Sequence, residues 1–304
     1  MTEAQPPLLL HSLATFEAEL IACLDAARPR RIVEIGSETG AFSDVLLDWA
    51  TGNDATVVTV DPELPEALRS RAGSSGNLEV VAGASPAALE EVEPAGAYVI
   101  DGDHNYFTVG AELEGIYAGR EEDPSSAPLT ILHDVCWPCG RRDAYYAPDR
   151  IPAEHRHPHD YRRGAVPGRS ELVEGGFRGG GEWAFATNEG GPANGVLTAV
   201  EDFLADRPAL RLVVLPCVFG VGVLFHRGAP YATTIEERLG SLDESALLAR
   251  LEENRLHLYL TVLDLQDELE RRRARFDSAL ASAHARIGVL EAQNSALRLD
   301  GVRP

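Results

Sequence analysis

The chain has 304 residues, with 27 basic against 48 acidic side chains and a formal net charge of −21. All of the basic side chains are arginines, because the sequence contains no lysine. Binding to nucleic acid or to an anionic membrane requires clustered positive charge, so this balance argues against both kinds of partner. The 44% of hydrophobic residues are enough to bury a sizeable core. We therefore expect a globular protein whose partners are small molecules or other proteins.

The compartment is indicated by what the sequence lacks. No apolar run approaches the ~20 residues needed to cross a bilayer, and residues 1–10 have neither the basic start nor the cleavage site of a signal peptide. Four cysteines are too few for a disulfide scaffold. These features predict a cytoplasmic protein.

Short apolar runs alternate with helical patterns in the first half of the chain, which is typical of a parallel sheet covered by helices. A helical pattern spans residues 12–27, and another spans 41–50. The predicted strands are 31–35, 56–60, 78–82, 98–100 and 129–132, followed late in the chain by an antiparallel hairpin of 212–216 and 221–226. The predicted fold class is α/β, a Rossmann-like doubly wound sheet that is mostly parallel, within a domain of residues 1–233.

Residues 137–192 have a different composition, rich in Gly, Pro, Arg, His and Tyr. Residues 137–187 contain eight arginines and seven acids, whereas residues 1–136 contain six arginines and 24 acids. Long segments of this kind in compact domains are usually lids or binding segments. We expect a substrate-binding insert that closes over an anionic or polyhydroxyl acceptor, with the side chains of Arg141, Arg142, Arg162, Arg163, Tyr145 and Tyr146 as candidate contacts.

A heptad pattern without proline spans residues 234–298 and predicts a long helix. The seam consists of Val262, Leu269, Phe276, Ala283, Leu290 and Leu297, flanked by Leu258 and Leu265 and then by Leu280 and Ile287, with Arg272 and Arg286 interrupting the flanking row. Either this helix packs along its own domain or it forms a coiled coil with a partner. A helix of roughly 85 to 95 Å is much longer than a domain is wide, which favours a coiled coil and a homo-oligomer, with residues 234–304 as the association region.

A glycine loop between the first strand and the next helix is the first candidate site. Glu34-Ile-Gly36-Ser-Glu-Thr-Gly40 lets backbone approach a ligand closely at a helix N-terminus. The G-x-x-x-G spacing, unlike the G-x-G-x-x-G of hydride-transfer enzymes, favours S-adenosylmethionine over a dinucleotide. Asp61 at the end of the second strand suits the ribose of either ligand, and a plain tight turn is the alternative.

Ionisable side chains also follow two neighbouring strands. Asp101 and His104 follow the strand ending at residue 100, and His133 and Asp134 follow the strand ending at residue 132. Such strand ends lie at the edge where open α/β sheets bind ligands. Asp101 and Asp134, with His133 as a third ligand, are candidates to hold Mg²⁺ or another divalent cation. The alternative is that these residues only cap strands and form turns.

The order of E-I-G-x-x-x-G, V-D-P, G-A-S, I-D-G-D-H-x-Y and H-D resembles the class I S-adenosylmethionine-dependent methyltransferases. The similarity is greatest to the metal-dependent catechol-type and macrolide-sugar O-methyltransferases, over residues 12–136 and 193–227. The resemblance implies cofactor contacts from Glu34, Gly36, Ser37, Gly40, Ser43, Asp61, Ala84, Ser85 and Asp101. It also implies that Asp101 and Asp134 bind metal, and that His104 is the catalytic base where catechol-type enzymes carry a lysine. His133 departs from the acid that relatives carry.

The predicted function is therefore methyl transfer from S-adenosylmethionine to a hydroxyl of a sugar, a glycoside or another natural product, assisted by a divalent cation and by His104. An NAD-dependent oxidoreductase and a non-catalytic coiled-coil scaffold are the alternatives. Two further patterns are open. The Cys136-x-x-Cys139 pair is a weak candidate for redox or zinc chemistry, and the His155, His157 and His159 tract is a weak candidate for metal binding.

Overall fold

The computed structural model describes residues 8–300, with side chains to residue 294. Its first elements alternate in the predicted way: a short 3₁₀ turn η1 (Leu13–Phe16), α1 (Glu17–Ala27), β1 (Arg31–Ile35), α2 (Ala41–Asn53), β2 (Thr56–Asp61), α3 (Glu66–Ala72), β3 (Leu78–Ala82), η2 (Ala87–Glu91), β4 (Ala97–Ile100), α4 (Tyr106–Tyr117) and β5 (Leu129–His133). The late elements are α5 (Val196–Leu204), β9 (Leu210–Leu215), β10 (Val221–His226), α6 (Ala232–Leu239) and α7 (Ala246–Asp300).

Seven strands form one sheet in the order β3-β2-β1-β4-β5-β10-β9. The first five are mutually parallel, and β10 lies antiparallel between β5 and β9. The predicted doubly wound, mostly parallel sheet with an antiparallel hairpin is therefore confirmed. Chain order reverses between β1 and β4, and open α/β sheets bind ligands beside the carboxyl ends of the strands at such a switch point.

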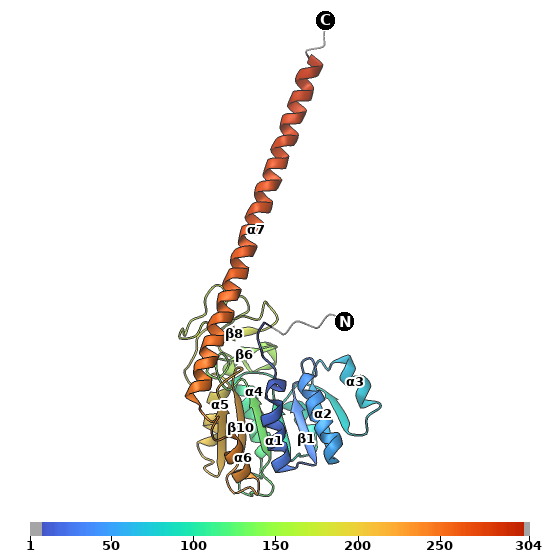
Figure 1. Ribbon diagram of the computed structural model, residues 1–304, viewed down its shortest axis with the longest axis vertical. Helices are drawn as coiled ribbons and strands as arrows, with labels where there is room; N and C mark the ends of the chain where they lie inside the picture. The colour runs from blue at the N-terminus through green and yellow to red at the C-terminus, as the bar shows by residue number, and fades with distance from the viewer. Residues whose placement is uncertain (1–7, 301–304) are drawn as a thin grey trace. The chain divides into compact units, whose positions relative to one another are not determined.

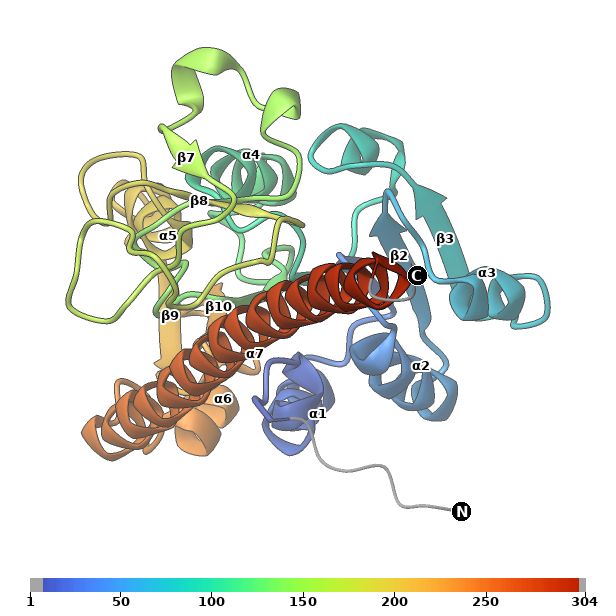
Figure 2. The same cartoon turned by 90° about the horizontal axis from the view of Figure 1, so that it is seen from above.

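Helices cover both faces of this sheet (Figure 2). Helices α1, α2 and α6 pack on one face, where Leu20, Leu46 and Ile235 are buried against strand residues such as Val57. Helices α4 and α5 pack on the other face, where Leu113 and Val200 meet strand residues such as Val33. Because both faces are covered, nearly every residue of the central strands is buried and most of these residues are apolar.

The insert between β5 and α5 has regular structure of its own. It contains β6 (Ala144–Tyr145), the 3₁₀ turns η3 (Pro148–Arg150) and η4 (Ala153–His155), β7 (His159–Asp160) and β8 (Ala184–Ala186). The three strands form a small antiparallel sheet in the order β6-β8-β7. The strands were not predicted, because two or three residues are too few to show alternation.

The C-terminal helix α7 is labelled in Figure 1. It begins at Ala246, later than the predicted start at residue 234, because α6 ends before Gly240 and the hydroxyl of Ser245 caps the new helix at the backbone N–H of Leu248. The chain divides into two compact units, residues 1–257 and residues 258–304. Leu297, the last residue of the predicted seam, has its side chain outside the described residues. Within the described part of the chain, no helix is both long and apolar enough to span a membrane.

Candidate active site

The glycine loop is pressed against the end of β4. Gly36 has φ +84°, and a Cβ atom added there would lie 2.2 Å from the carbonyl oxygen of Asp101. Only glycine fits such a close backbone approach in a left-handed conformation. Gly40, with φ +83°, is the N-cap of α2. The loop therefore brings the start of α2 beside the chain that leaves β4.

Glu34, at the carboxyl end of β1, is buried under this loop. The hydroxyls of Ser43 and Thr59 donate to its Oε2 at 2.6 and 3.0 Å. Burial raises the pKa of Glu34 to about 7 despite these two hydrogen bonds. Ser43 is fully buried and positions Glu34, so any contribution of Ser43 to cofactor binding goes through that carboxyl group.

A small pocket joins several of the predicted cofactor contacts. Its wall includes Glu34, Gly36, Ser37 and Asp101, together with Ser12 and Leu13 and the first residues of α2. These residues come from the carboxyl ends of β1 and β4, which are neighbours in the sheet. The pocket therefore lies at the switch point, where the fold predicts ligand binding.

Asp61 lies at the carboxyl end of the adjacent β2 and fixes the same loop. Its Oδ2 accepts hydrogen bonds from the backbone N–H and the hydroxyl of Ser37, at 2.8 and 3.0 Å. Its Oδ1 accepts from the backbone N–H of Glu63 at 2.7 Å. Asp61, the predicted ribose ligand, thus lies beside the predicted cofactor-binding loop, and hydrogen bonds to both of its oxygens fix the carboxylate.

Ala84 and Ser85 follow β3, the next strand along this edge. The hydroxyl of Ser85 donates to Glu112 of α4, and burial raises the pKa of Glu112 to about 8. The other carboxyl oxygen of Glu112 has no hydrogen-bond partner among the described residues. Sequence reasoning missed Glu112, because the sequence does not distinguish this buried acid from the exposed Glu114 on the same helix.

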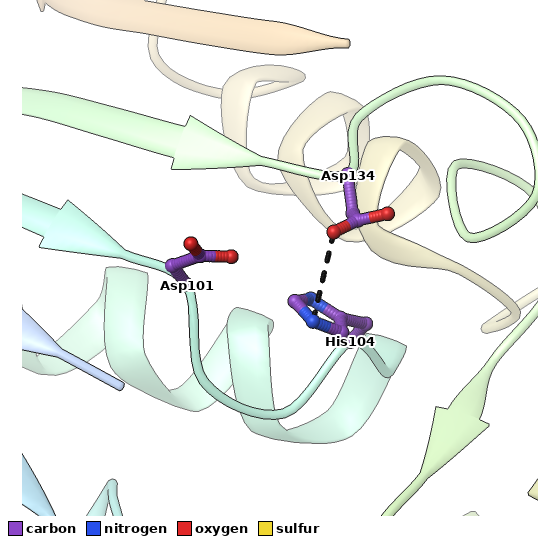
Figure 3. A group of neighbouring side chains, drawn as sticks. All are labelled: Asp101, His104 and Asp134. Atoms are coloured by element: carbon purple, nitrogen blue, oxygen red, sulfur yellow. Dashed lines mark ion pairs between the residues drawn. The ribbon is translucent and has the colours of Figure 1, made fainter. Parts of the chain in front are cut away.

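Asp101, His104 and Asp134 converge at the ends of β4 and β5 (Figure 3). Their ligand atoms all lie within 4.8 Å of one another, and Nε2 of His104 lies 3.6 Å from Oδ2 of Asp134. Asp134 has φ 58°, a left-handed conformation that is strained for most residues and that Asp tolerates. Two carboxylates and an imidazole form a donor set that suits a divalent cation.

His133 lies behind this group and binds both acids. Its Nδ1 lies 3.0 Å from Oδ1 of Asp101 and 3.3 Å from Oδ2 of Asp134, and its Nε2 donates to the carbonyl of Val218 at 3.0 Å. Burial opposes the charged form of the ring, but the two carboxylates outweigh burial and raise the pKa of His133 to about 9. A protonated His133 therefore supplies positive charge between the two acids. The third member of the group with Asp101 and Asp134 is His104 and not the predicted His133.

The insert is attached to the site through β6. The backbone N–H of Ala144 donates to the carbonyl of His104 at 2.9 Å. The ring of Tyr146 lies 6.1 Å from that of His104, and its side chain is half exposed. Of the six substrate contacts predicted in the insert, Tyr146 is the one that the structure places beside His104.

Three of the other five predicted substrate contacts are bonded to the protein itself. Arg142 is fully buried and donates to the carbonyls of Ala186 and Ser170 at 2.6 and 2.7 Å. Tyr145 is fully buried and donates to Asp143 at 2.7 Å. Arg141 forms a two-bond pair with Glu201 of α5. Arg162 and Arg163 are exposed.

The Cys136–Cys139 pair and the histidine tract of residues 155–159 make contacts within the protein. Cys139 is buried with its thiol hydrogen-bonded to Asp134, and burial raises the pKa of both Cys139 and Cys136, which keeps the thiols protonated. His155 stacks on Phe107, and the rings of His157 and His159 donate to backbone carbonyls. Neither pattern forms a metal group within residues 8–294.

Known proteins resemble this chain in sequence and in fold. Residues 33–118 match the family model described as a methyltransferase domain. A methyltransferase of Podospora anserina with bound S-adenosylhomocysteine is 14% identical, over 69% of this chain and 77% of that protein, with a TM-score of 0.39. A cofactor-bound protein from MTB is 15% identical over 73% and 84% of the two chains, with a TM-score of 0.41.

A third solved structure, the N,N-8-amino-8-demethyl-D-riboflavin dimethyltransferase of Streptomyces davawensis, is 23% identical over 38% of this chain and 36% of that one, with a TM-score of 0.30. No curated protein matches the chain. The matched residues 33–118 contain the glycine loop, Asp61 and the Asp101–His104 segment. The family match thus confirms, for residues 33–118, the resemblance of this chain to the class I S-adenosylmethionine-dependent methyltransferases.

Proposed function

We propose that the protein transfers the methyl group of S-adenosylmethionine to a hydroxyl oxygen of a small molecule, with a sugar or another natural product as the acceptor. The observation that carries this proposal is the convergence of Asp101, His104 and Asp134 next to the pocket under the glycine loop. A hydroxyl is a weak nucleophile near pH 7, so O-methylation requires groups that orient it and remove its proton. This cluster supplies both kinds of group.

His104 is the proposed base. Its Nε2 faces the carboxylate of Asp134, which stabilises the imidazolium formed when His104 accepts a proton. The chain contains no lysine that could take this role. Tyr146, whose ring centroid lies 6.1 Å from that of His104, is the proposed wall of the acceptor site, where it would limit the entry of water.

Asp101 and Asp134 are the proposed holders of a divalent cation. Two carboxylates with one protonated histidine between them leave net negative charge in a largely buried place, which a cation would offset. Such a cation would supply Lewis acidity that lowers the pKa of the acceptor hydroxyl. The imidazole of His104 is close enough to serve as a third ligand, so the roles of His104 as ligand and as base can be separated only by experiment.

The cofactor is tested first by calorimetry on the full chain. We expect S-adenosylmethionine to bind and NAD to give no heat, because the loop has the G-x-x-x-G spacing. Gly36→Ala should abolish binding, since its Cβ would overlap the backbone at Asp101, whereas Gly52→Ala, on an open part of α2, should bind as the wild type does. Binding of NAD in place of S-adenosylmethionine would refute the proposal.

The base is tested with His104→Ala and His104→Gln on an acceptor found by screening hydroxylated small molecules with methyl-labelled cofactor. We expect kcat to fall about 10²- to 10⁴-fold with cofactor affinity unchanged. Wild-type turnover in His104→Ala would exclude His104 as the base. If turnover survives chelation of metals but not loss of His104, the cation role is wrong and the base role stands.

A further inference from the structure

The described part of the helix beyond His257 carries an exposed apolar stripe. Its large side chains are exposed by 43% at Leu280 up to 67% at Leu269. The stripe consists of Leu258, Leu265, Leu269, Phe276, Leu280, Ile287 and Leu290. A helix with such a face is stabilised by packing that face against another helix rather than by its own hydrogen bonds.

The spacing of the stripe defines a register with one discontinuity. From Leu258 to Leu269 the seam positions are spaced alternately by four and three residues, at 258, 262, 265 and 269. From Leu280 to Leu297 the same alternation gives 280, 283, 287, 290, 294 and 297. Between these two parts, Leu269 and Leu280 are separated by an eleven-residue repeat, which is the sequence mark of a stutter that locally unwinds a coiled coil. With the stutter included, Ile287 takes the seam position and Arg286 moves to its flank.

The residues at the seam favour a coiled coil of two parallel helices. After the stutter, Leu280, Ile287 and Asn294 occupy position a, and Ala283, Leu290 and Leu297 occupy position d. A β-branched residue at a with leucine at d favours dimers, as at Ile287 and Leu290, and a single asparagine at a fixes the register and the number of helices. In a parallel, in-register pair, the amide of Asn294 meets the amide of the partner's Asn294.

The flanking charges agree with a second copy as the partner. In parallel dimers a residue at g faces the residue at e five positions later in the other chain. This rule pairs Glu268 with the partner's Arg273 where the stutter begins, and Arg286 with the partner's Glu291 beyond the stutter. Both pairs have opposite signs. Glu268 also contacts Arg271 and Arg272 of its own helix, so its pair with the partner is the weaker of the two.

An antiparallel dimer fits less well. It can bring Glu268 opposite the partner's Arg286, which keeps the charges complementary. That alignment, however, places Asn294 opposite the apolar segment of residues 258–262 in the other chain. A buried amide without a hydrogen-bond partner destabilises the pair, and a symmetric dimer contains two such sites.

We propose that residues 258–297 join two copies of this chain as a parallel, in-register coiled coil with a stutter between Leu269 and Leu280. The mass of the full-length protein in solution tests the association, and it should be twice the 32.8 kDa of one chain. Ile287→Asp, on the seam, should give monomers. Val289→Asp, at an equally exposed position two residues away and off the seam, should leave the dimer intact.

Orientation is tested by oxidative cross-linking of the full chain. Ala283→Cys places a thiol at position d, where parallel in-register helices bring the two copies together, and should give a covalent dimer. Ala281→Cys, at an outer position of the same turn, and the wild type with its four cysteines serve as controls and should stay uncrosslinked. A monomeric wild type, or a dimer in which Ala283→Cys cross-links no better than Ala281→Cys, would overturn the proposal. Circular dichroism and cofactor binding verify that each variant is folded.

Discussion

Two regions of the molecule carry polar side chains that the sequence marks as functional, and they differ in how those side chains are satisfied. At the ends of β4 and β5, Asp101, His104 and Asp134 face one another with negative charge in excess. In the insert, the polar groups of Arg142 and Tyr145 are bonded to protein on nearly every side. The first arrangement leaves atoms available for a ligand, and the second uses its atoms to hold a loop in place.

The difference teaches that residue type alone does not separate binding from support. An arginine in a Gly-rich insert is a residue type expected at an anion-binding site. Arg142 nevertheless binds three backbone carbonyls and the carboxylate of Glu189. By contrast, the carboxylate of Asp134 faces His104 and His133 beside Asp101, where the donor set suits a cation. Substitutions in the two regions should therefore separate activity from stability.

The largest effect on activity is expected from Asp134→Asn. The change keeps the shape and the tolerated backbone conformation but removes the negative charge beside His104 and from the cation site. We expect kcat to fall about 10³-fold or more, with a thermal midpoint within a few degrees of the wild type. Steady-state kinetics and thermal unfolding measure the two quantities. A variant that loses stability in proportion to its activity would show that Asp134 is structural.

The opposite outcome is expected from Arg142→Met in the insert. Removing the guanidinium leaves buried carbonyls and Glu189 without their donor, which should cost about 3 to 5 kcal/mol of unfolding free energy. Methionine preserves most of the side-chain volume, so the loss comes from polar contacts. Urea unfolding measures the cost. At a temperature where the variant is folded, its kcat should stay within about threefold of the wild type, and a selective rise in the acceptor KM would instead place Arg142 in the acceptor site.

The main sheet could be predicted because its strands are short, mainly apolar runs, several of which are followed by a polar residue. Asp61, Asp101 and Asp134 are such residues, and the parallel topology alone brings them to one edge. The partners of each side chain could not be predicted, since they are contacts between distant segments. His133 pairs with Asp101 from another strand, and Arg142 binds carbonyls about 28 and 44 residues away in the chain. The strands of the insert were likewise missed because they are too short to show a period.

A smaller, pH-dependent effect on stability is expected from Glu112. This residue is buried like Arg142, but one of its carboxyl oxygens has no hydrogen-bond partner among the described residues. Burial raises the pKa of Glu112 to about 8 in the folded protein, above the value near 4.5 in the unfolded chain. Folding therefore binds a proton. Its contribution to stability is complete below about pH 4.5 and is lost as the pH rises toward 8.

Glu112→Gln should remove this dependence, because glutamine does not titrate and can still accept a hydrogen bond from Ser85. Urea unfolding at pH 5 and pH 8 should show a smaller loss of stability in the variant than in the wild type, by a few kcal/mol. Glu114→Gln, on the same helix with a carboxylate that pairs at the surface with Arg207, is the matched control. Equal losses in Glu112→Gln and the wild type would mean that Glu112 is ionised in the folded state.

The smallest effect is expected from Arg141→Ala. Arg141 and Glu201 form a surface pair whose side chains are both about half exposed, and pairs of this kind contribute about 0 to 1 kcal/mol. The structure gives Arg141 a partner on α5 rather than a position beside Asp134, so kcat and the acceptor KM should both stay within about twofold of the wild type. Glu201→Ala should behave the same way, since it breaks the same pair. A tenfold rise in the acceptor KM for Arg141→Ala alone would mean that Arg141 leaves Glu201 for the substrate, which would extend the acceptor site into the insert.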